Sequence, residues 1–132
     1  MIIQIKATNI ELNESLRIFV EEKVGELKKN LVKFEEIPEK GREKIDVRVE
    51  IGKTTRHHRK GDIFRAEIQI YLPKKLLRAV VKNTDLRSAI IEARDELDRE
   101  IRKYKGKRLG RAREWARRAK FARRSINFFK KK

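Results

Sequence analysis

Apolar and polar residues alternate with a period of two in three segments of the chain, a pattern typical of β-strands with one buried face. The segments are Ile45–Ile51, Phe64–Ile70 and Leu76–Lys82. A turn at Pro73-Lys74-Lys75 separates the second segment from the third. The opening segment, Met1–Lys6, is short and rich in β-forming residues, and we expect it to form a first strand.

Two further segments repeat apolar residues at helical spacing. Asn13 is the expected N-cap of the first helix, and Glu14 places a negative charge in its first turn, where the helix dipole favours it. The apolar stripe of this helix consists of Leu16, Phe19, Val20, Val24, Leu27 and Leu31. The second helix is expected to begin near Thr84-Asp85 and to end at Gly106. Its stripe consists of Leu86, Ile90, Ala93, Leu97, Ile101 and Tyr104.

The predicted order of elements is therefore β-α-β-β-β-α. Alternating strands form a sheet with one dry face and one wet face, and the helices cover the dry face. We expect an α+β fold, a two-layer sandwich in which two helices lie on one face of a four-stranded sheet.

The positive charge is concentrated at the C-terminal end of the chain. Lys and Arg number 37 and Asp and Glu number 20, so the 132 residues carry a net charge of +17. Residues 106–132 alone hold 12 basic residues and one acid, Glu114. Large apolar residues are also sparse there, so this segment cannot bury a core of its own. We divide the chain into a folded domain, residues 1–105, and a polycationic tail, residues 106–132.

Composition and motifs argue against several classes of protein. The chain has no Cys, no apolar run approaches the roughly 20 residues that cross a bilayer, and no leader-like segment opens it. Its carboxylates alternate with Lys and Arg and form no converging catalytic set. His57-His58 lacks the further ligands that a metal needs. We expect a soluble cytoplasmic protein that is not an enzyme and has no cofactor, metal, small-molecule substrate or membrane partner.

Basic residues gather in a hairpin loop, at the end of the second helix and in the tail, which favours nucleic-acid binding. Guanidinium groups pair with phosphates, and aromatic residues such as Trp115 can stack on unpaired bases. The expected RNA-binding residues of these segments are Arg56, Arg59, Lys60, Arg99, Arg102, Lys103, Lys105, Lys107, Arg108, Arg111, Arg113, Arg117, Arg118, Arg123 and Arg124. Blander explanations exist for two of the segments: a loop can simply be solvated, and Lys103 and Lys105 can stabilise the helix dipole.

Lys23 lies within the apolar stripe of the first helix, where an apolar residue is expected. Its stem can follow the rim of the core while the ammonium stays in water. Alternatively, it points at a ligand along that rim. The residues alone leave both interpretations open.

Several motifs together resemble the ribosome hibernation promoting factors, the family that includes protein Y and the ribosome-associated inhibitor. The resemblance covers Ile2 to about Lys107 and depends on the order and spacing of the motifs. They are Asn9-Ile10-Glu11-Leu12-Asn13-Glu14-Ser15-Leu16, Arg65-Ala66-Glu67-Ile68, Leu77-Arg78-Ala79, Thr84-Asp85-Leu86 with Ala89-Ile90, and Leu97-x-Arg99-x-Ile101-x-Lys103-x-Lys105.

The resemblance implies a fold like that of double-stranded-RNA-binding domains and a place in the decoding channel of the small ribosomal subunit. There the protein would block messenger and transfer RNA, inhibit translation and preserve idle ribosomes under stress. Its partners would be the small subunit and its ribosomal RNA. The residues implied to face RNA phosphates are Lys23, Lys28, Arg78, Arg99, Lys103, Lys105 and Lys107, which favours the functional interpretation of Lys23.

Three features depart from the family pattern. The hairpin loop that carries His57-His58 is longer and more basic than in short members. Arg87 replaces the usual aromatic residue, and it either adds a phosphate contact or removes a stacking one. The second domain with which long members pair ribosomes has no counterpart, so we expect no pairing by this chain. The tail takes its place, and we expect it to follow ribosomal RNA and to become helical on binding.

Three rival functions remain open. One is a purely structural ribosomal protein, which would accompany translating ribosomes as well as idle ones. A general double-stranded-RNA or DNA binder needs the same basic surface. An interfacial helix at a membrane is also rich in Trp, Phe, Arg and Lys, but the apolar residues of the tail are scattered over several faces.

Overall fold

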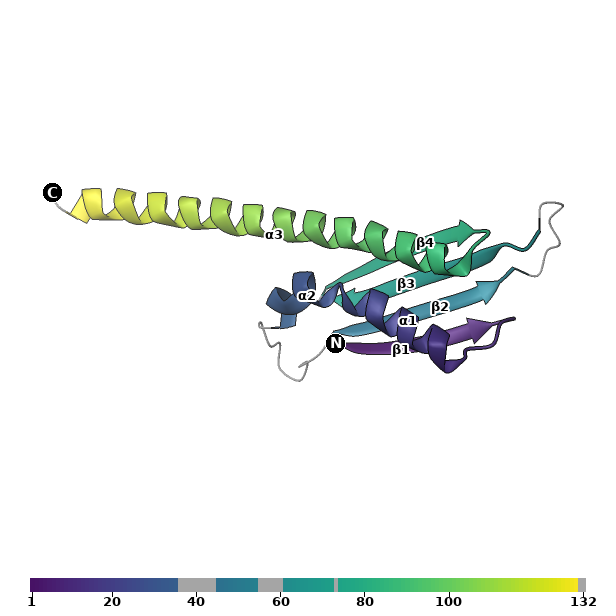
Figure 1. Ribbon diagram of the computed structural model, residues 1–132. Coiled ribbons are helices and arrows are strands. Elements are labelled where there is room, and N and C mark those ends of the chain that lie inside the picture. The colour runs from purple at the N-terminus through teal and green to yellow at the C-terminus, as the bar shows by residue number, and fades with distance from the viewer. Residues whose placement is uncertain (36–44, 55–60, 73, 131–132) are drawn as a thin grey trace. The chain divides into compact units, whose positions relative to one another are not determined.

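The computed structural model confirms the α+β fold and adds one helix (Figure 1). It describes residues 1–35, 45–54, 61–72 and 74–130, with side chains for 1–31, 45–54, 61–72, 74–107 and 114–120. The elements are β1 (Ile2–Thr8), α1 (Glu14–Gly25), α2 (Lys28–Glu35), β2 (Asp46–Lys53), β3 (Phe64–Leu72), β4 (Lys75–Asn83) and α3 (Leu86–Lys130). The chain forms two compact units, Met1–Ile101 and Arg102–Lys132.

The four strands form one mixed sheet in the order β1-β2-β3-β4. β1 is parallel to β2, whereas β2, β3 and β4 are antiparallel to their neighbours. The register brings the apolar residues into rows across the sheet, for example Ile3, Val47, Ile70 and Leu77. Because side chains alternate between the faces of a strand, this register makes one face apolar throughout.

The helices of the first unit lie on that apolar face, and the core is between the two layers (Figure 1). Val20, Val24 and Leu31 from the first two helices are fully buried, as are Ile90 and Leu97 from α3. Burial of such side chains is worth about 1.5–3 kcal/mol each. The predicted apolar stripes therefore form the helical half of the core.

Both predicted helix starts are confirmed. The Asn13 side chain accepts a hydrogen bond from the backbone N–H of Leu16, at 2.8 Å. Asp85 accepts one from the backbone N–H of Ser88, at 3.0 Å, and another from its hydroxyl, at 2.6 Å. The Ser88 hydroxyl, followed by the Ser88 backbone N–H, lowers the pKa of the Asp85 carboxyl.

The first predicted helix is divided in two at Glu26 and Leu27. The backbone N–H of Leu27 donates to the carbonyl of Val24, three residues back, at 3.0 Å, and Asn30 donates likewise to Leu27. Gly25 directly precedes the break, and the low helix propensity of glycine favours a break at this point. Leu27 and Leu31 are both buried, so the break preserves the stripe that predicted one helix.

The predicted helix end at Gly106 is wrong, because α3 continues through it to Lys130. A glycine that ends a helix usually adopts a left-handed backbone, and Gly106 has none. Glycine within a helix costs only about 1 kcal/mol relative to alanine. The Ala, Arg, Leu and Lys residues that follow are strong helix formers, which compensates for that cost.

Candidate nucleic-acid interface

Two predicted RNA-binding residues meet at one aromatic ring on the helical layer. The guanidinium carbon of Arg87 lies 4.7 Å from the centroid of the Phe19 ring, and the ammonium of Lys23 lies 5.8 Å from it. Arg87 also donates a hydrogen bond to the Ser15 hydroxyl, at 3.4 Å. We call Ser15, Phe19, Lys23 and Arg87 the Phe19 cluster. It joins α1 to the first turn of α3 and fixes two cations at the surface of the helices.

Lys23 lies at the rim of the core, which agrees with the first of the two interpretations given above, a side-chain stem that follows the rim. Its side chain is 26% exposed, and its ammonium lies 3.6 Å from a carboxylate oxygen of Glu26. Val20 and Val24, one turn before it and directly after it, are fully buried. The ammonium thus already has a carboxylate neighbour, and its contact with RNA phosphate stays a prediction.

A second group of polar side chains links the helices, and its members are paired with one another. Arg94 of α3 is paired with Glu26, the residue that caps the C-terminal end of α1, and with Asp95, the latter at 2.7 Å. Asn30 of α2 donates to the carboxylate of Asp98, at 2.5 Å. Arg94 is only 18% exposed, so it stabilises the contact between helices and is a poor candidate for binding phosphate.

Other cations of the helical layer are exposed and form no ion pair with a described residue. Lys28 and Arg99, both predicted to bind RNA, belong to this group. So do Arg17 and Lys29, which are not among the residues predicted to bind RNA. Their positions on the solvent side of the helical pattern are the signal that could have identified them. Phosphate groups would meet no competing carboxylate at these four positions.

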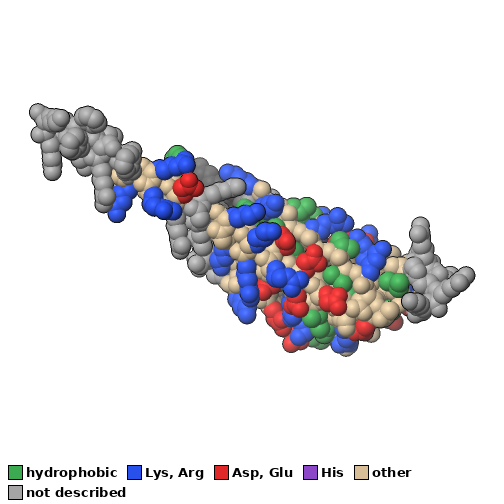
Figure 2. Space-filling model, turned by 90° about the horizontal axis from the view of Figure 1, so that it is seen from above, with side chains coloured by type: hydrophobic (Ala, Val, Ile, Leu, Met, Phe, Trp, Pro, Cys, Tyr) green, Lys and Arg blue, Asp and Glu red, His purple; other side chains and the backbone are tan. Residues whose placement is uncertain are grey.

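The second unit presents its basic residues along α3. Arg102, Lys103, Lys107, Arg117, Arg118 and Lys120 are exposed, and Lys105 is half-buried. Arg118 is paired with Glu114 at 2.9 Å, and Trp115 is 73% exposed. Figure 2 shows basic side chains predominating on the described part of this unit. Arg108, Arg111, Arg113, Arg123 and Arg124 belong to α3, but their side chains lie outside the described residues.

The structure separates Arg78 from the Phe19 cluster. Leu77 and Ala79 of β4 are buried toward the helices, so Arg78 between them projects from the opposite face of the sheet. There it binds both carboxylate oxygens of Glu67, at 3.2 Å each, and the second oxygen also accepts from Arg65 at 2.9 Å. Glu67 is only 6% exposed. The Arg78 hydrogen bonds lower the pKa of this carboxyl, burial opposes them, and Arg65 adds to the lowering.

The remaining predicted residues, Arg56, Arg59, Lys60 and the His57-His58 pair, lie outside the described residues. Within the described ranges, no three His, Asp or Glu side chains are grouped as metal ligands. None of the described helices is long and apolar enough to cross a membrane.

Fold and surface together define an α+β domain that displays cations on its helical layer and along a basic terminal helix. Residues 3–109 match the family model described as "Sigma 54 modulation protein / S30EA ribosomal protein". The chain therefore belongs to that family, and the resemblance found in the sequence is confirmed.

Individual relatives agree with this assignment. The ribosome hibernation promotion factor of Deinococcus radiodurans is 31% identical over 105 residues, covering 79% of this chain and 49% of the relative. The chain thus spans about half the length of that curated relative. The crystal structure of the Thermus thermophilus Protein Y N-terminal domain matches with 26% identity and a TM-score of 0.60, covering 79% of this chain and 99% of the other. A ribosomal subunit interface protein from Coxiella burnetii, 17% identical with a TM-score of 0.58 over 80% and 99% of the two chains, has the same fold.

Proposed function

We propose that this protein is a ribosome hibernation factor that occupies the decoding channel of the small ribosomal subunit. There it blocks messenger and transfer RNA, inhibits translation and preserves idle ribosomes in the cytoplasm. The observation that carries the proposal is the set of exposed cations without carboxylate partners on the helical layer, Lys28 and Arg99 among them, in a chain of this family.

The proposed mechanism is occlusion and requires no chemical step. A rigid two-layer domain fits a channel walled by RNA, and its cations replace the counterions of the phosphates. RNA helices are recognised mainly by shape and by 2′-hydroxyl and phosphate contacts, so specificity comes from the fit of the domain. Release of the counterions supplies much of the affinity.

The basic helix of the second unit extends this interaction along ribosomal RNA. Its spaced Arg and Lys side chains contact successive phosphates, and the exposed Trp115 is available to stack on an unpaired base. Whether the helix depends on bound RNA stays a prediction.

Sedimentation with ribosomes tests the proposal. The protein is mixed with vacant small subunits or with subunits preloaded with messenger and transfer RNA, and the bound fraction is measured after centrifugation. Occlusion predicts binding to the vacant particles and exclusion from the loaded ones. Equal binding to both would contradict it, and equal affinity for any long RNA or DNA duplex would favour the general nucleic-acid binder instead.

A pair of matched variants tests the surface. Lys28→Gln/Arg99→Gln removes two exposed cations of the helical layer and should weaken binding to vacant subunits by about tenfold or more. Lys74→Asn/Lys75→Gln removes the same charge at the turn before β4 and should bind normally. Asn suits position 74, because Lys74 has a positive φ of 65°. Equal losses in both variants would mean that net charge, and not this surface, governs binding.

A further inference from the structure

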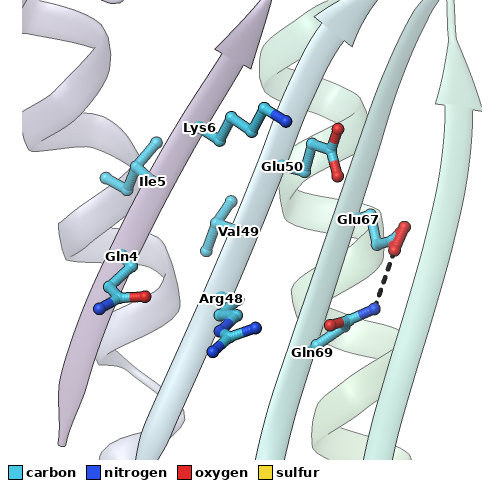
Figure 3. Close-up of a pocket in the computed structure, with 8 residues that line it drawn as sticks. All are labelled: Gln4, Ile5, Lys6, Arg48, Val49, Glu50, Glu67 and Gln69. Carbon is cyan, nitrogen blue, oxygen red and sulfur yellow. Dashed lines mark hydrogen bonds between the residues drawn. The ribbon is translucent and has the colours of Figure 1, made fainter.

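The wet face of the sheet carries a structured polar surface on the side opposite the helical cations that carry the proposed function. Figure 3 views this face with the helices behind it. The strand register places Gln4, Arg48, Gln69 and Arg78 in one row across the four strands. The neighbouring row consists of Lys6, Glu50, Glu67 and Val80. Within the first unit, no described helix covers these rows.

A shallow hollow of about 460 Å³ lies over β1, β2 and β3 on this face. Gln4, Lys6, Arg48, Glu50, Glu67 and Gln69 surround it (Figure 3). Side chains from both rows project toward the viewer and leave the hollow open to solvent. It is therefore accessible to a group carried by a much larger molecule.

Hydrogen bonds and one stacking contact fix the β3 side of the hollow. The Tyr71 hydroxyl donates to the side-chain oxygen of Gln69 at 2.8 Å, and the Gln69 amide donates to Glu67 at 3.1 Å. The guanidinium carbon of Arg48 lies 5.0 Å from the centroid of the Tyr71 ring. Arg48 is exposed, so the guanidinium face turned away from that ring is available for a second planar group.

The β1 side offers polar groups that are free to bind. Gln4 and Lys6 are exposed, and neither they nor Glu50 form a hydrogen bond or ion pair with another described residue. An amide, an ammonium and a carboxylate thus line the hollow together with Arg48 (Figure 3). Two carboxylates at the hollow, those of Glu50 and Glu67, make it a poor site for a simple anion.

The wider face is complementary to RNA in charge. Its basic residues are Lys6, Arg48, Arg65, Arg78 and Lys82, and its acidic residues are Asp46, Glu50 and Glu67. The net charge of the face is therefore +2, and Glu67 is already neutralised by its two arginines. Bases stack on guanidinium planes, and amides and carboxylates pair with base edges and 2′-hydroxyls.

We propose that this hollow binds one unpaired nucleotide of an RNA strand. The base stacks on Arg48, Gln4 and Glu50 contact its polar edge or the ribose 2′-hydroxyl, and Lys6 contacts the adjacent phosphate. The site lies on the opposite side of the sheet from the helical layer and therefore gives the protein a second, independent RNA contact.

An NMR titration of the full ¹⁵N-labelled chain tests this site. The probes are a single-stranded hexanucleotide of RNA, the same sequence as a blunt duplex, adenosine monophosphate and inorganic phosphate. The single strand should shift the amide resonances of β1, β2 and β3 around the hollow, and the duplex should not. Shifts confined to the helices and the tail would overturn the proposal, as would equal shifts with inorganic phosphate alone or with the duplex. If adenosine monophosphate matches the hexanucleotide in affinity, the ligand is a free nucleotide and the RNA assignment fails.

Two substitutions of Arg48 separate stacking from charge. Arg48→Lys keeps the charge but lacks the planar guanidinium, and Arg48→Gln lacks both. Because base stacking contributes about five- to 150-fold to affinity, each should weaken binding at this site at least fivefold. Lys75→Gln removes one charge elsewhere on the sheet and should leave the affinity unchanged, and the spectra report whether each variant is folded.

Normal affinity in both Arg48 variants would overturn the proposal. Because the titration contains no ribosome, its failure would leave the decoding-channel proposal to its own sedimentation test.

Discussion

Glu67 is the acidic residue on which the polar surface of the sheet depends. Its carboxylate accepts hydrogen bonds from Arg65, Gln69 and Arg78, while its own side chain is almost fully covered. A buried carboxylate is tolerated only when such partners replace water. Its removal should therefore loosen three neighbours at once.

The lowered pKa of Glu67 makes a testable contribution to stability. Because its pKa is lower in the folded state than in the unfolded chain, this stability is complete above the ordinary value of 4.5. It is lost as the pH falls below that value through the lowered pKa. Glu67→Gln should reduce the free energy of unfolding at pH 7 by about 1 kcal/mol, since water screens the partly exposed arginines.

Urea unfolding between pH 7 and pH 3 measures this contribution. The difference between the wild type and Glu67→Gln should shrink as the pH falls. Glu100→Gln, a change at an exposed carboxylate of α3, should leave the pH profile as it is. A constant difference between wild type and Glu67→Gln across the range would refute the electrostatic explanation.

Arg87 and Phe19 should be energetically coupled. A guanidinium over an aromatic ring at the surface contributes about 0.5–1 kcal/mol. A double-mutant cycle of Arg87→Met and Phe19→Leu, followed by urea unfolding, should give a coupling of that size. Additive effects of the two substitutions would show that the contact does not stabilise the fold.

Contacts between residues close together in the chain were predictable from the sequence, whereas contacts between residues far apart in the chain were not. Asn13 and Asp85 cap helices through residues three positions away, so the sequence alone predicted both. The contact of Arg87 with Phe19 joins residues far apart in the chain and requires the packing of two helices. Alternation along β4 could have placed Arg78 on the wet face, but the family resemblance grouped it with the helical cations.

At the scale of elements, periodicity predicted three of the four strands, the β-forming residues of Met1–Lys6 predicted the first, and the Thr84-Asp85 pair predicted the start of α3. Periodicity did not predict the break between α1 and α2, because the apolar stripe continues across it. The end of α3 was also predicted wrongly, because that prediction depended on a single residue, Gly106. A glycine stops a helix only when a left-handed turn is formed, and that depends on the residues that follow it.

Two glycine substitutions should have opposite effects. A β-carbon at Gly106 would have no atom within 4 Å outside its own helix, whereas one at Gly52 would lie 2.6 Å from the carbonyl oxygen of Thr8. Gly106→Ala should therefore increase the helix content of the tail, favouring the helix locally by about 0.5–1 kcal/mol. Gly52→Ala should destabilise the sheet.

Circular dichroism and thermal unfolding measure these two effects. The helix signal of Gly106→Ala should rise at low temperature, and the melting temperature of Gly52→Ala should fall. Loss of helix signal in Gly106→Ala would mean that this glycine adopts another conformation in solution.

At the scale of the whole molecule, the two units differ in how their acidic and basic residues are distributed. The first unit combines acidic and basic residues and pairs several of them, while the second is almost purely basic. Ion pairs contribute to the contacts of the first unit, whereas the many like charges of the second unit repel one another. The sequence alone indicates this difference in charge, because it depends only on where acidic and basic residues occur in the chain.

Salt should weaken the binding to small subunits in proportion to the phosphates contacted. For contacts with 6–10 phosphates, affinity falls about 10³- to 10⁵-fold between 50 and 200 mM salt. Lys28→Gln/Arg99→Gln should lower the magnitude of the slope of log affinity against log salt by about 1.5, since each lost phosphate contact lowers it by about 0.7–0.9. Titrations by fluorescence anisotropy at several salt concentrations measure the slope. An unchanged slope would mean that these two side chains do not contact phosphate.

The parallel pairing of β1 with β2 has a consequence for how the sheet assembles. β2, β3 and β4 follow one another in the chain and pair in that order, whereas Ile2 of β1 pairs with Asp46, which is far away in the sequence. Closing that longer loop costs more entropy, so the three-stranded meander can collapse before the opening strand attaches. During synthesis, the residues of β1 would then leave the ribosome first but join the folded sheet among the last.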